Sequence, residues 1–398
     1  MNRRKKTDQA TRDPFAVDAG VDAGTNPVRY REESSPVRTI AVTGVGLCEP
    51  VGPAAIWRPR LNNAYEQELF RAARRESVIT DWRVRSFTPD DFTGQSRSPL
   101  NNLHLRAQEI AFHDALSAAG LVRKIGRKQS RRVGVIYIDF YGNTSSLERE
   151  LSSRELYYLD VYPTYLLQNH NISGFSIKMC GERNGVMEAL EVAQTLIHSR
   201  ELDTVILGGV FPCYAYLFLS EAREEARVLK RLARGGELNY CERSMFLVIE
   251  DESVANERGQ TAKFRVDEPA HYRLPAGLDF GSYWSARWQT RKDSEGAADI
   301  RVCFGGAYGA AATDEEFAAF ARVYPDAARI DLGQAGDSGQ LNALLPFTES
   351  FAKQIGGTNH PTTGALIHTW DRNGSGSDLR VQLVDAGQAN PAVPATQK

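Results

Sequence analysis

One stretch, residues 174–210, constrains the fold of this chain more than any other feature: GFSIKMCGERNGVMEALEVAQTLIHSRELDTVILGGV. An apolar segment is followed by a polar segment at residues 180–185. Residues 185–198 then carry apolar side chains on one face of a helical pattern. The nearly all-apolar residues 203–210 predict a strand that is covered on both faces. This order is typical of enzymes that place a nucleophile at the start of a buried helix. Whether the polar segment contains a nucleophile therefore decides between an enzyme and a non-catalytic partner protein of the same fold.

The rest of the chain repeats strand and helix patterns in two similar halves. Strands are predicted at residues 38–46, 132–139 and 299–306, a strand followed by a polar stretch at 245–259, and a strand that leads into a Gly-rich loop at 328–336. Helices are predicted at 103–120, 314–324 and 341–357, and two strands around a Gly/Ser-rich turn at 364–385. Two such halves indicate a duplicated α/β layer protein. We expect a flexible basic and polar tail at residues 1–36, a first half at 37–260, a second half at 261–385 and a loose tail at 386–398.

Composition excludes several classes of protein. The 398 residues carry a formal net charge of −2, which gives no basis for non-specific binding of nucleic acid. No apolar run approaches the roughly 20 residues that cross a bilayer, and the basic N-terminus lacks the apolar segment of a secretory signal. The five cysteines are an odd number without CxxC spacing, so we expect no metal site, no disulfide framework and a reducing, cytoplasmic setting. No cofactor is implied.

Four segments, taken in order, resemble the β-ketoacyl synthase family of the thiolase fold. They are IAVTGVGLCEPVG, the long stretch quoted above, a shortened LNYCERSMFLVIEDESVANERG and the closing ALIHTWDRNGSGSDLRVQLV. They resemble that family's opening strand and loop, its nucleophile region, its FDxxRDGF segment and its final hairpin. The resemblance implies a five-layer α/β fold of two pseudo-symmetric βαβ halves, and a protein that forms dimers.

The resemblance also implies where a catalytic triad would stand. An active ketosynthase needs a cysteine at a helix N-terminus, where the dipole favours the thiolate, and two histidines that assist decarboxylation and stabilise the enolate. An alignment without gaps puts Arg183 at the nucleophile position and Phe304 and Gln340 at the two histidine positions. Cys180 falls three residues too early, on the incoming strand. The triad is therefore predicted to be degenerate.

Arg183 cannot replace a cysteine in this chemistry. Arginine keeps its proton at any working pH, so it cannot attack a thioester. Its charge also opposes the helix dipole by about 0.3–1 kcal/mol, which requires compensation by Glu182, Asp337 or a bound anion. His368, which stands where the family has an asparagine, is interpreted as structural.

These features predict a catalytically silent ketosynthase homologue, similar to the chain length factors of type II polyketide or fatty-acid-like systems. It would pair with an active ketosynthase, shape the tunnel of the growing chain and meet an acyl carrier protein. The predicted interface is the strand at residues 174–181, with Phe175, Ile177 and Met179 alternating with polar residues. Two alternatives stay open: a stand-alone homodimer that binds acyl groups or carriers, and an acyltransferase that uses Cys180.

Overall fold

The computed structural model describes the following residues: 38–58, 64, 67, 68, 71, 81–92, 102–121, 130–139, 164–181, 183–213, 237–275, 279–294, 300–306, 309–356, 364–371 and 374–384. All of them belong to one structural unit, Arg38–Lys398. The two predicted tails, residues 1–36 and 386–398, lie outside the described residues.

The elements alternate between strands and helices along both halves of the chain. The first half contains β1 (Ile40–Cys48), β2 (Ala55–Ile56), β3 (Asp81–Arg85), η1 (Pro89–Phe92), α2 (Leu103–Ala118), β4 (Val133–Asp139), β5 (Ile177–Cys180), α5 (Gly185–His198), β6 (Thr204–Phe211), β7 (Glu237–Cys241), β8 (Arg243–Asp251) and α7 (Glu252–Glu257). The second half contains β9 (Phe264–Val266), β10 (Ala270–Arg273), α8 (Phe280–Ser294), β11 (Ile300–Gly305), α9 (Gly309–Val323), β12 (Ala328–Asp331), η2 (Leu332–Ala335), η3 (Gly339–Phe347), α10 (Glu349–Gly356), β13 (Gly364–Trp370) and β14 (Ser375–Leu383).

The strand order reveals a duplication. In the first half the order is β5-β4-β6-β8-β1, and in the second half it is β12-β11-β13-β14-β10. The directions match as well. β4 is parallel to β5 and β6, as β11 is to β12 and β13. β8 is antiparallel to β6 and β1, and β14 is likewise antiparallel to β13 and β10. β9 pairs with β1 and β14 and joins the two sets into one 11-stranded sheet. The predicted pseudo-symmetric halves are thus confirmed, while their boundary at residue 260 stays a prediction.

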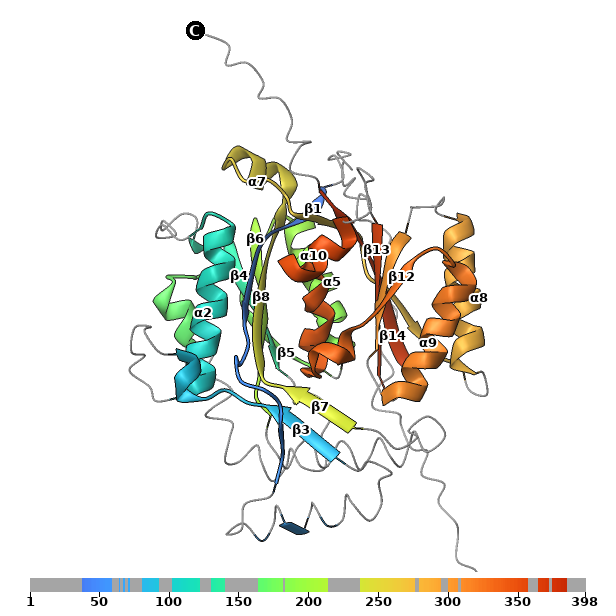
Figure 1. The fold of residues 1–398 in the computed structure, drawn as a ribbon. Coiled ribbons are helices and arrows are strands. Elements are labelled where there is room, and N and C mark those ends of the chain that lie inside the picture. The colour runs from blue at the N-terminus through green and yellow to red at the C-terminus, as the bar shows by residue number, and fades with distance from the viewer. Residues whose placement is uncertain are drawn as a thin grey trace, which may run out of the picture. The chain divides into compact units, whose positions relative to one another are not determined.

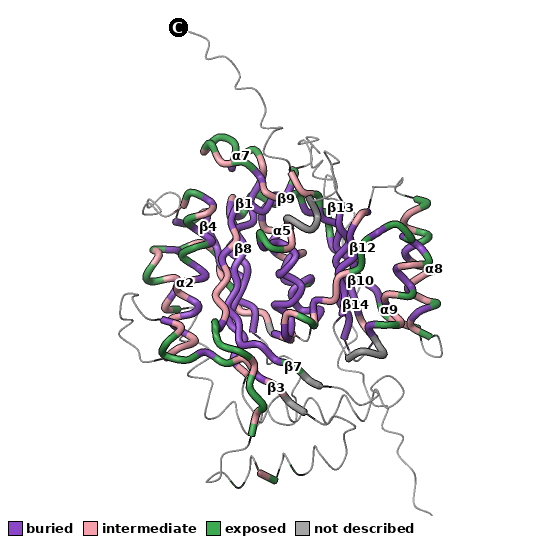
Figure 2. The backbone as a smooth tube through the Cα atoms, viewed as in Figure 1, coloured by how far each residue is buried: buried purple, intermediate pink, exposed green. Residues whose placement is uncertain are grey.

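Helices and strands stack in five layers (Figure 1). α2 covers the outer face of the first set of strands, α5 lies with η3 and α10 in the middle, and α8 and α9 cover the outer face of the second set. The middle layer and the strand faces around it are buried (Figure 2). Leu190 of α5, Leu345 of η3 and Phe304 of β11 belong to this central core, with Phe112 and Trp288 in the two outer cores. The predicted five-layer fold is confirmed.

The predicted helix at residues 341–357 is wrong in one respect. The segment forms the 3-10 helix η3 and then the α-helix α10, with Thr348 in an extended conformation between them. Pro346 lacks a backbone N–H and its ring hinders the preceding α-helical turn, so one continuous helix cannot form. In the part of the chain that the structure describes, no helix combines the length and apolar character that a membrane crossing requires.

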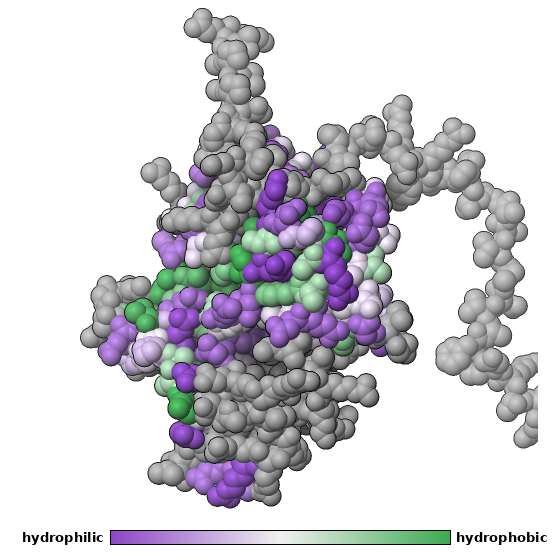
Figure 3. All heavy atoms as spheres, turned by 45° about the vertical axis from the view of Figure 1, so that its right-hand side comes forward, coloured by the Kyte–Doolittle hydropathy of each residue, from purple (hydrophilic) through white to green (hydrophobic). Residues whose placement is uncertain are grey.

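Helix α8 was not predicted. Its buried side contains Trp284 and Trp288, four residues apart, whereas Gln289, Thr290 and Asp293 are exposed. Figure 3 shows hydrophilic side chains on the side of the molecule where α8 and α9 lie. Two tryptophans supply enough apolar surface to seat the helix although most of its residues are polar.

A small sheet of β2, β3 and β7 lies beside the main sheet, with β3 antiparallel to β2 and parallel to β7. Tyr240 at the end of β7 forms an isolated parallel bridge with Asp337. Asp337 donates its backbone N–H to the carbonyl of Asn239 at 2.7 Å, and Cys241 donates its N–H to the carbonyl of Asp337 at 2.9 Å. The backbone of Asp337 is thereby fixed, which matters for the site below.

Candidate functional site

The centre of the candidate site is the N-terminus of α5, which begins at Gly185 as predicted. Gly181 leads into this turn and lies so close to the helix that a Cβ on it would stand 2.8 Å from the Cα of Gly185. Only glycine permits that approach. The buried face of α5 includes Val186, Leu190 and Ile197, and it sets the direction of the helix within the middle layer.

Arg183, the residue at the predicted nucleophile position, forms a bidentate ion pair with Asp337. Its Nη1 donates to Oδ1 at 2.7 Å and its Nη2 donates to Oδ2 at 2.5 Å. The side chains are 7% and 17% exposed, respectively. Oδ1 of Asp337 also accepts the backbone N–H of Gly339 at 2.8 Å. The charge of Arg183 is therefore balanced by Asp337, one of the three compensating groups predicted; Glu182 lies outside the described residues.

A second carboxylate, Asp371, meets the start of the same helix. The backbone N–H of Asn184 donates to Oδ1 of Asp371 at 2.9 Å, and the hydroxyl of Thr369 donates to the side-chain oxygen of Asn184 at 3.1 Å. A helix N-terminus favours negative charge, and here the chain supplies that charge itself. Sequence reasoning missed Asp371 because nothing local to it points to Asn184, 187 residues earlier in the chain.

Gln340, at the second histidine position, reaches the same place from η3. Its side-chain Nε2 donates to the carbonyl of Asp139 at 2.6 Å and to the carbonyl of Gly181 at 3.0 Å. Its Oε1 lies 2.9 Å from the position that a Cβ on Gly185 would take. The structure thus brings Arg183 and Gln340 together around the first residue of α5.

Phe304, at the first histidine position, lies within the hydrophobic core. It is fully buried on β11, and its ring meets Phe351 of α10 edge-on with 5.8 Å between centroids. The neighbouring thiol of Cys303 is also buried, and this burial raises the pKa of Cys303. Neither side chain offers a proton donor or acceptor that could serve a reacting group at neutral pH.

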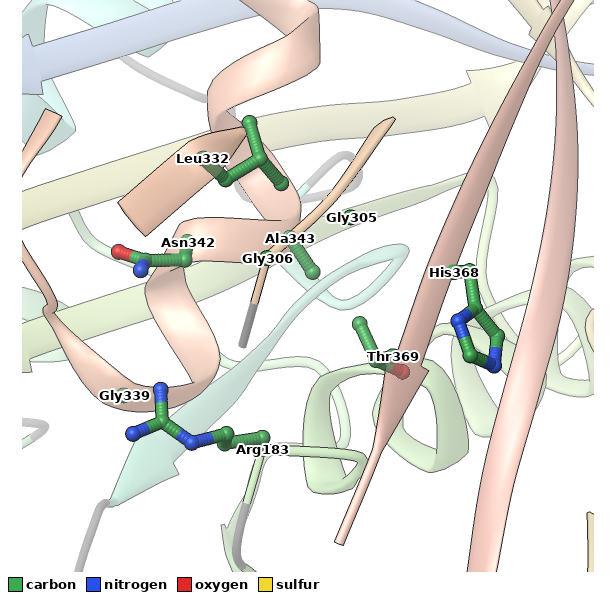
Figure 4. Close-up of a pocket in the computed structure, with 9 residues that line it drawn as sticks. All are labelled: Arg183, Gly305, Gly306, Leu332, Gly339, Asn342, Ala343, His368 and Thr369. Carbon is green, nitrogen blue, oxygen red and sulfur yellow. The ribbon is translucent and has the colours of Figure 1, made fainter. Parts of the chain in front are cut away.

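A small cavity lies beside Arg183 (Figure 4). It measures about 20 Å³ and is lined by Arg183, Gly305, Gly306, Leu332, Gly339, Asn342, Ala343, His368 and Thr369. A cavity of this size holds about one water molecule, whereas pockets for small-molecule ligands span roughly 300–1,000 Å³. Among the described residues, this cavity therefore has no room for a ligand larger than water.

His368 is part of a buried hydrogen-bonded chain beside this cavity. Nε1 of Trp284 donates to the hydroxyl of Tyr272 at 2.7 Å, and the hydroxyl of Tyr272 lies 2.7 Å from Nε2 of His368. Nδ1 of His368 contacts Glu316, whose other oxygen accepts the N–H of Gly306 at 2.9 Å. Burial raises the pKa of Tyr272 well above its ordinary value, so its hydroxyl stays protonated. These contacts agree with the interpretation of His368 as structural.

The predicted interface strand lies at an edge of the sheet. In the described part of the chain, β5 has β4 as its one strand neighbour. Phe175 is 49% exposed and Ile177 is 41% exposed, while Met179 is partly buried. Cys180 ends β5 opposite Asp139, and its side chain lies outside the described residues. Its role as a displaced nucleophile stays a prediction.

Comparisons with known proteins give a fold. No model of a known protein family matches the chain, and no curated protein matches its sequence. Among solved structures, the ishigamide ketosynthase/chain length factor is 16% identical, with a TM-score of 0.59, and the match covers 87% of this chain and 100% of that one. A β-ketoacyl synthase from Burkholderia phymatum is 13% identical, with a TM-score of 0.60 and the same two coverages.

A third structure is described as the type II polyketide acyl-carrier protein AntDE:AntF in complex with its ketosynthase bound to the hexaketide. It is 15% identical, has a TM-score of 0.59, and the match covers 87% of this chain and 99% of that one. The strand order, the five layers and these matches agree with one another. The chain has the thiolase fold of these ketosynthase structures.

Proposed function

We propose that this chain is a non-catalytic subunit that pairs with an active ketosynthase and shapes the tunnel in which the growing acyl or polyketide chain lies. The observation that carries the proposal is the Arg183–Asp337 ion pair at the start of α5. A ketosynthase needs a thiolate at that place, and the pair puts a permanently protonated, internally neutralised group there instead.

The surrounding groups support the same reading. The positive end of α5 already has the carboxylate of Asp371 within hydrogen-bonding distance. Phe304 and Gln340 stand at the predicted histidine positions, and neither a phenyl ring nor an amide transfers protons at neutral pH. The cavity beside Arg183 has room for about one water molecule and none for an acyl thioester. This arrangement holds a fold together rather than turning over a substrate.

Pairing is supported by the edge position of β5, which among the described strands pairs with β4 alone. An edge strand with exposed apolar side chains accepts another strand through backbone hydrogen bonds and side-chain burial. Phe175 and Ile177 supply such side chains, and Met179, two residues further along the same face, is partly buried. The ishigamide structure is described as a ketosynthase with a chain length factor, and AntDE:AntF as a carrier protein with its ketosynthase. We therefore infer an active ketosynthase and an acyl carrier protein as partners, in the cytoplasm.

The catalytic half of the proposal is tested with the purified chain and malonyl-loaded carrier protein. We expect neither decarboxylation nor condensation, and the Arg183→Cys variant to stay inactive in condensation because Phe304 and Gln340 still occupy the histidine positions. Turnover by the chain alone that is lost in Cys180→Ser would instead establish a divergent acyltransferase.

The pairing half is tested by coexpression with the cognate active ketosynthase. We expect the two chains to copurify as a heterodimer, measured by size-exclusion chromatography with light scattering. A homodimer that does not exchange with the ketosynthase would replace the proposal with its alternative, a stand-alone protein that binds acyl groups or carriers.

A further inference from the structure

Gln340 joins the ends of two adjacent strands with one side chain. Asp139 is the last residue of β4, Gly181 directly follows β5, and the carbonyls of both accept hydrogen bonds from Nε2 of Gln340. Asp139 is paired with Cys180 in the β4–β5 register, so these carbonyls lie at the same end of the sheet. A primary amide nitrogen carries two hydrogens, so a single glutamine can satisfy both acceptors.

A residue of the second half of the duplicated fold thereby binds the strand ends at one edge of the first half. Gln340 belongs to η3, and only 2% of its surface is exposed. Its Oε1 is buried without a hydrogen-bond partner among the described residues. A buried amide oxygen without a hydrogen-bond partner costs folding free energy, and the other contacts of the side chain have to offset that cost. The two contacts that it does make are with the strand ends.

We propose that Gln340 is a positioning residue that fixes the ends of β4 and β5 and so sets the shape of the edge on which a partner strand docks. This inference rests on the proposed pairing function. β5 has only four residues and one strand neighbour among the described residues, and its end is held by backbone pairing with β4, by the ion pair of Lys178 with Asp139 at 3.8 Å and by Gln340. A partner strand depends on the positions of these backbone groups, because its own backbone hydrogen bonds form with that edge.

The chain contains a matched control in Gln194. This residue of α5 is 3% exposed, its Nε2 donates to the carbonyl of Asp267 at 2.9 Å, and its Oε1 has no partner among the described residues. Like Gln340, it joins the predicted halves through a buried amide. Unlike Gln340, it makes no described hydrogen bond to β4 or β5. The same substitution at the two positions separates loss of stability from loss of edge geometry.

The experiment compares Gln340→Met and Gln340→Glu with Gln194→Met and Gln194→Glu. Methionine keeps the side-chain volume and removes the N–H donors. The methionine variants carry the test if the buried charge of the glutamate variants prevents folding. Amide exchange by mass spectrometry follows the peptides that cover residues 133–139 and 174–181 in the isolated chain. We expect about tenfold faster exchange at the end of β5 in the Gln340 variants, and no change there in the Gln194 variants.

A second measurement is the Kd for the ketosynthase partner. Loss of the two hydrogen bonds of Gln340 should raise Kd by about tenfold, whereas Gln194 variants of equal thermal stability should stay within about twofold. Equal changes at both positions, in exchange or in Kd, would overturn the positioning role. If the wild-type chain forms no complex at all, the proposed pairing function fails, and the exchange measurement alone still decides the role of Gln340.

Discussion

The two outermost strands of the sheet, β5 and β12, occupy equivalent places in the duplicated halves, yet their side chains differ. Near β5, Phe175 and Ile177 are exposed, whereas on β12 the exposed residues are Ala328 and Arg329. Charged side chains discourage the addition of another strand and apolar ones favour it. The two halves have similar edge strands, but only the side chains near β5 are suited to the addition of a partner strand.

The centre of the molecule shows the same divergence. The first half places α5, a regular 14-residue helix, in the middle layer. The second half places η3 there, a 3-10 helix with Pro346 inside it, followed by α10. The residues that bind the segment just before α5, Asp337, Gln340 and Asp371, all come from the second half. One half supplies the helix and the other supplies the groups that neutralise and hold its end.

The largest effect is expected when the central contact between the halves is broken. Asp337→Ala leaves the charge of Arg183 buried without its carboxylate, which should cost about 3–5 kcal/mol of unfolding free energy. Urea unfolding measures this value. The double variant Arg183→Met with Asp337→Ala should recover part of the loss because the buried charge is removed. A single variant that costs less than about 1 kcal/mol would show that the pair behaves like a surface ion pair.

The edge comparison itself is tested by placing a charge on each outer strand. Ile177→Asp on β5 should weaken ketosynthase binding by about 30-fold or more, as expected for a buried interface residue that contributes about 2 kcal/mol. Arg329→Asp on β12 should leave the affinity within about threefold, and Val51→Asp, at another exposed apolar residue, serves as a further control. Isothermal titration calorimetry measures the affinities. Equal weakening by Ile177→Asp and Arg329→Asp would remove the distinction between the edges.

The smallest effect is expected at the end of β12. Burial raises the pKa of Asp331, so the folded chain holds this proton more tightly than the unfolded chain does. Stability therefore falls as the pH rises from the ordinary pKa of 3.8 through the raised value. Asp331→Asn should raise Tm slightly at pH 7 and lose this advantage near pH 3.5. A stabilisation that is independent of pH would point to a cause other than the charge.

Much of the fold could be predicted because its signals are local. The bounds of α5 follow from an apolar stripe that repeats every turn, and β4 and β6 follow from short apolar runs that end at polar residues or glycine. α8 escaped prediction because two tryptophans, rather than a continuous stripe, bury it. The break between η3 and α10 was signalled by Pro346, but its position required the backbone.

The sequence by itself determined which residue types stand near the start of α5 and therefore that Arg183 cannot act as a thiolate. It also determined the elements whose periodicity lies within a few neighbouring residues. The tertiary structure decided that Asp337 meets Arg183 across 154 residues of chain and that Gln340 reaches Asp139 across 201. It also decided that β5 ends as an edge while β4 is enclosed. The physical reason is that helix and strand patterns depend on adjacent residues, whereas ion pairs, caps and edges depend on which distant segments pack together.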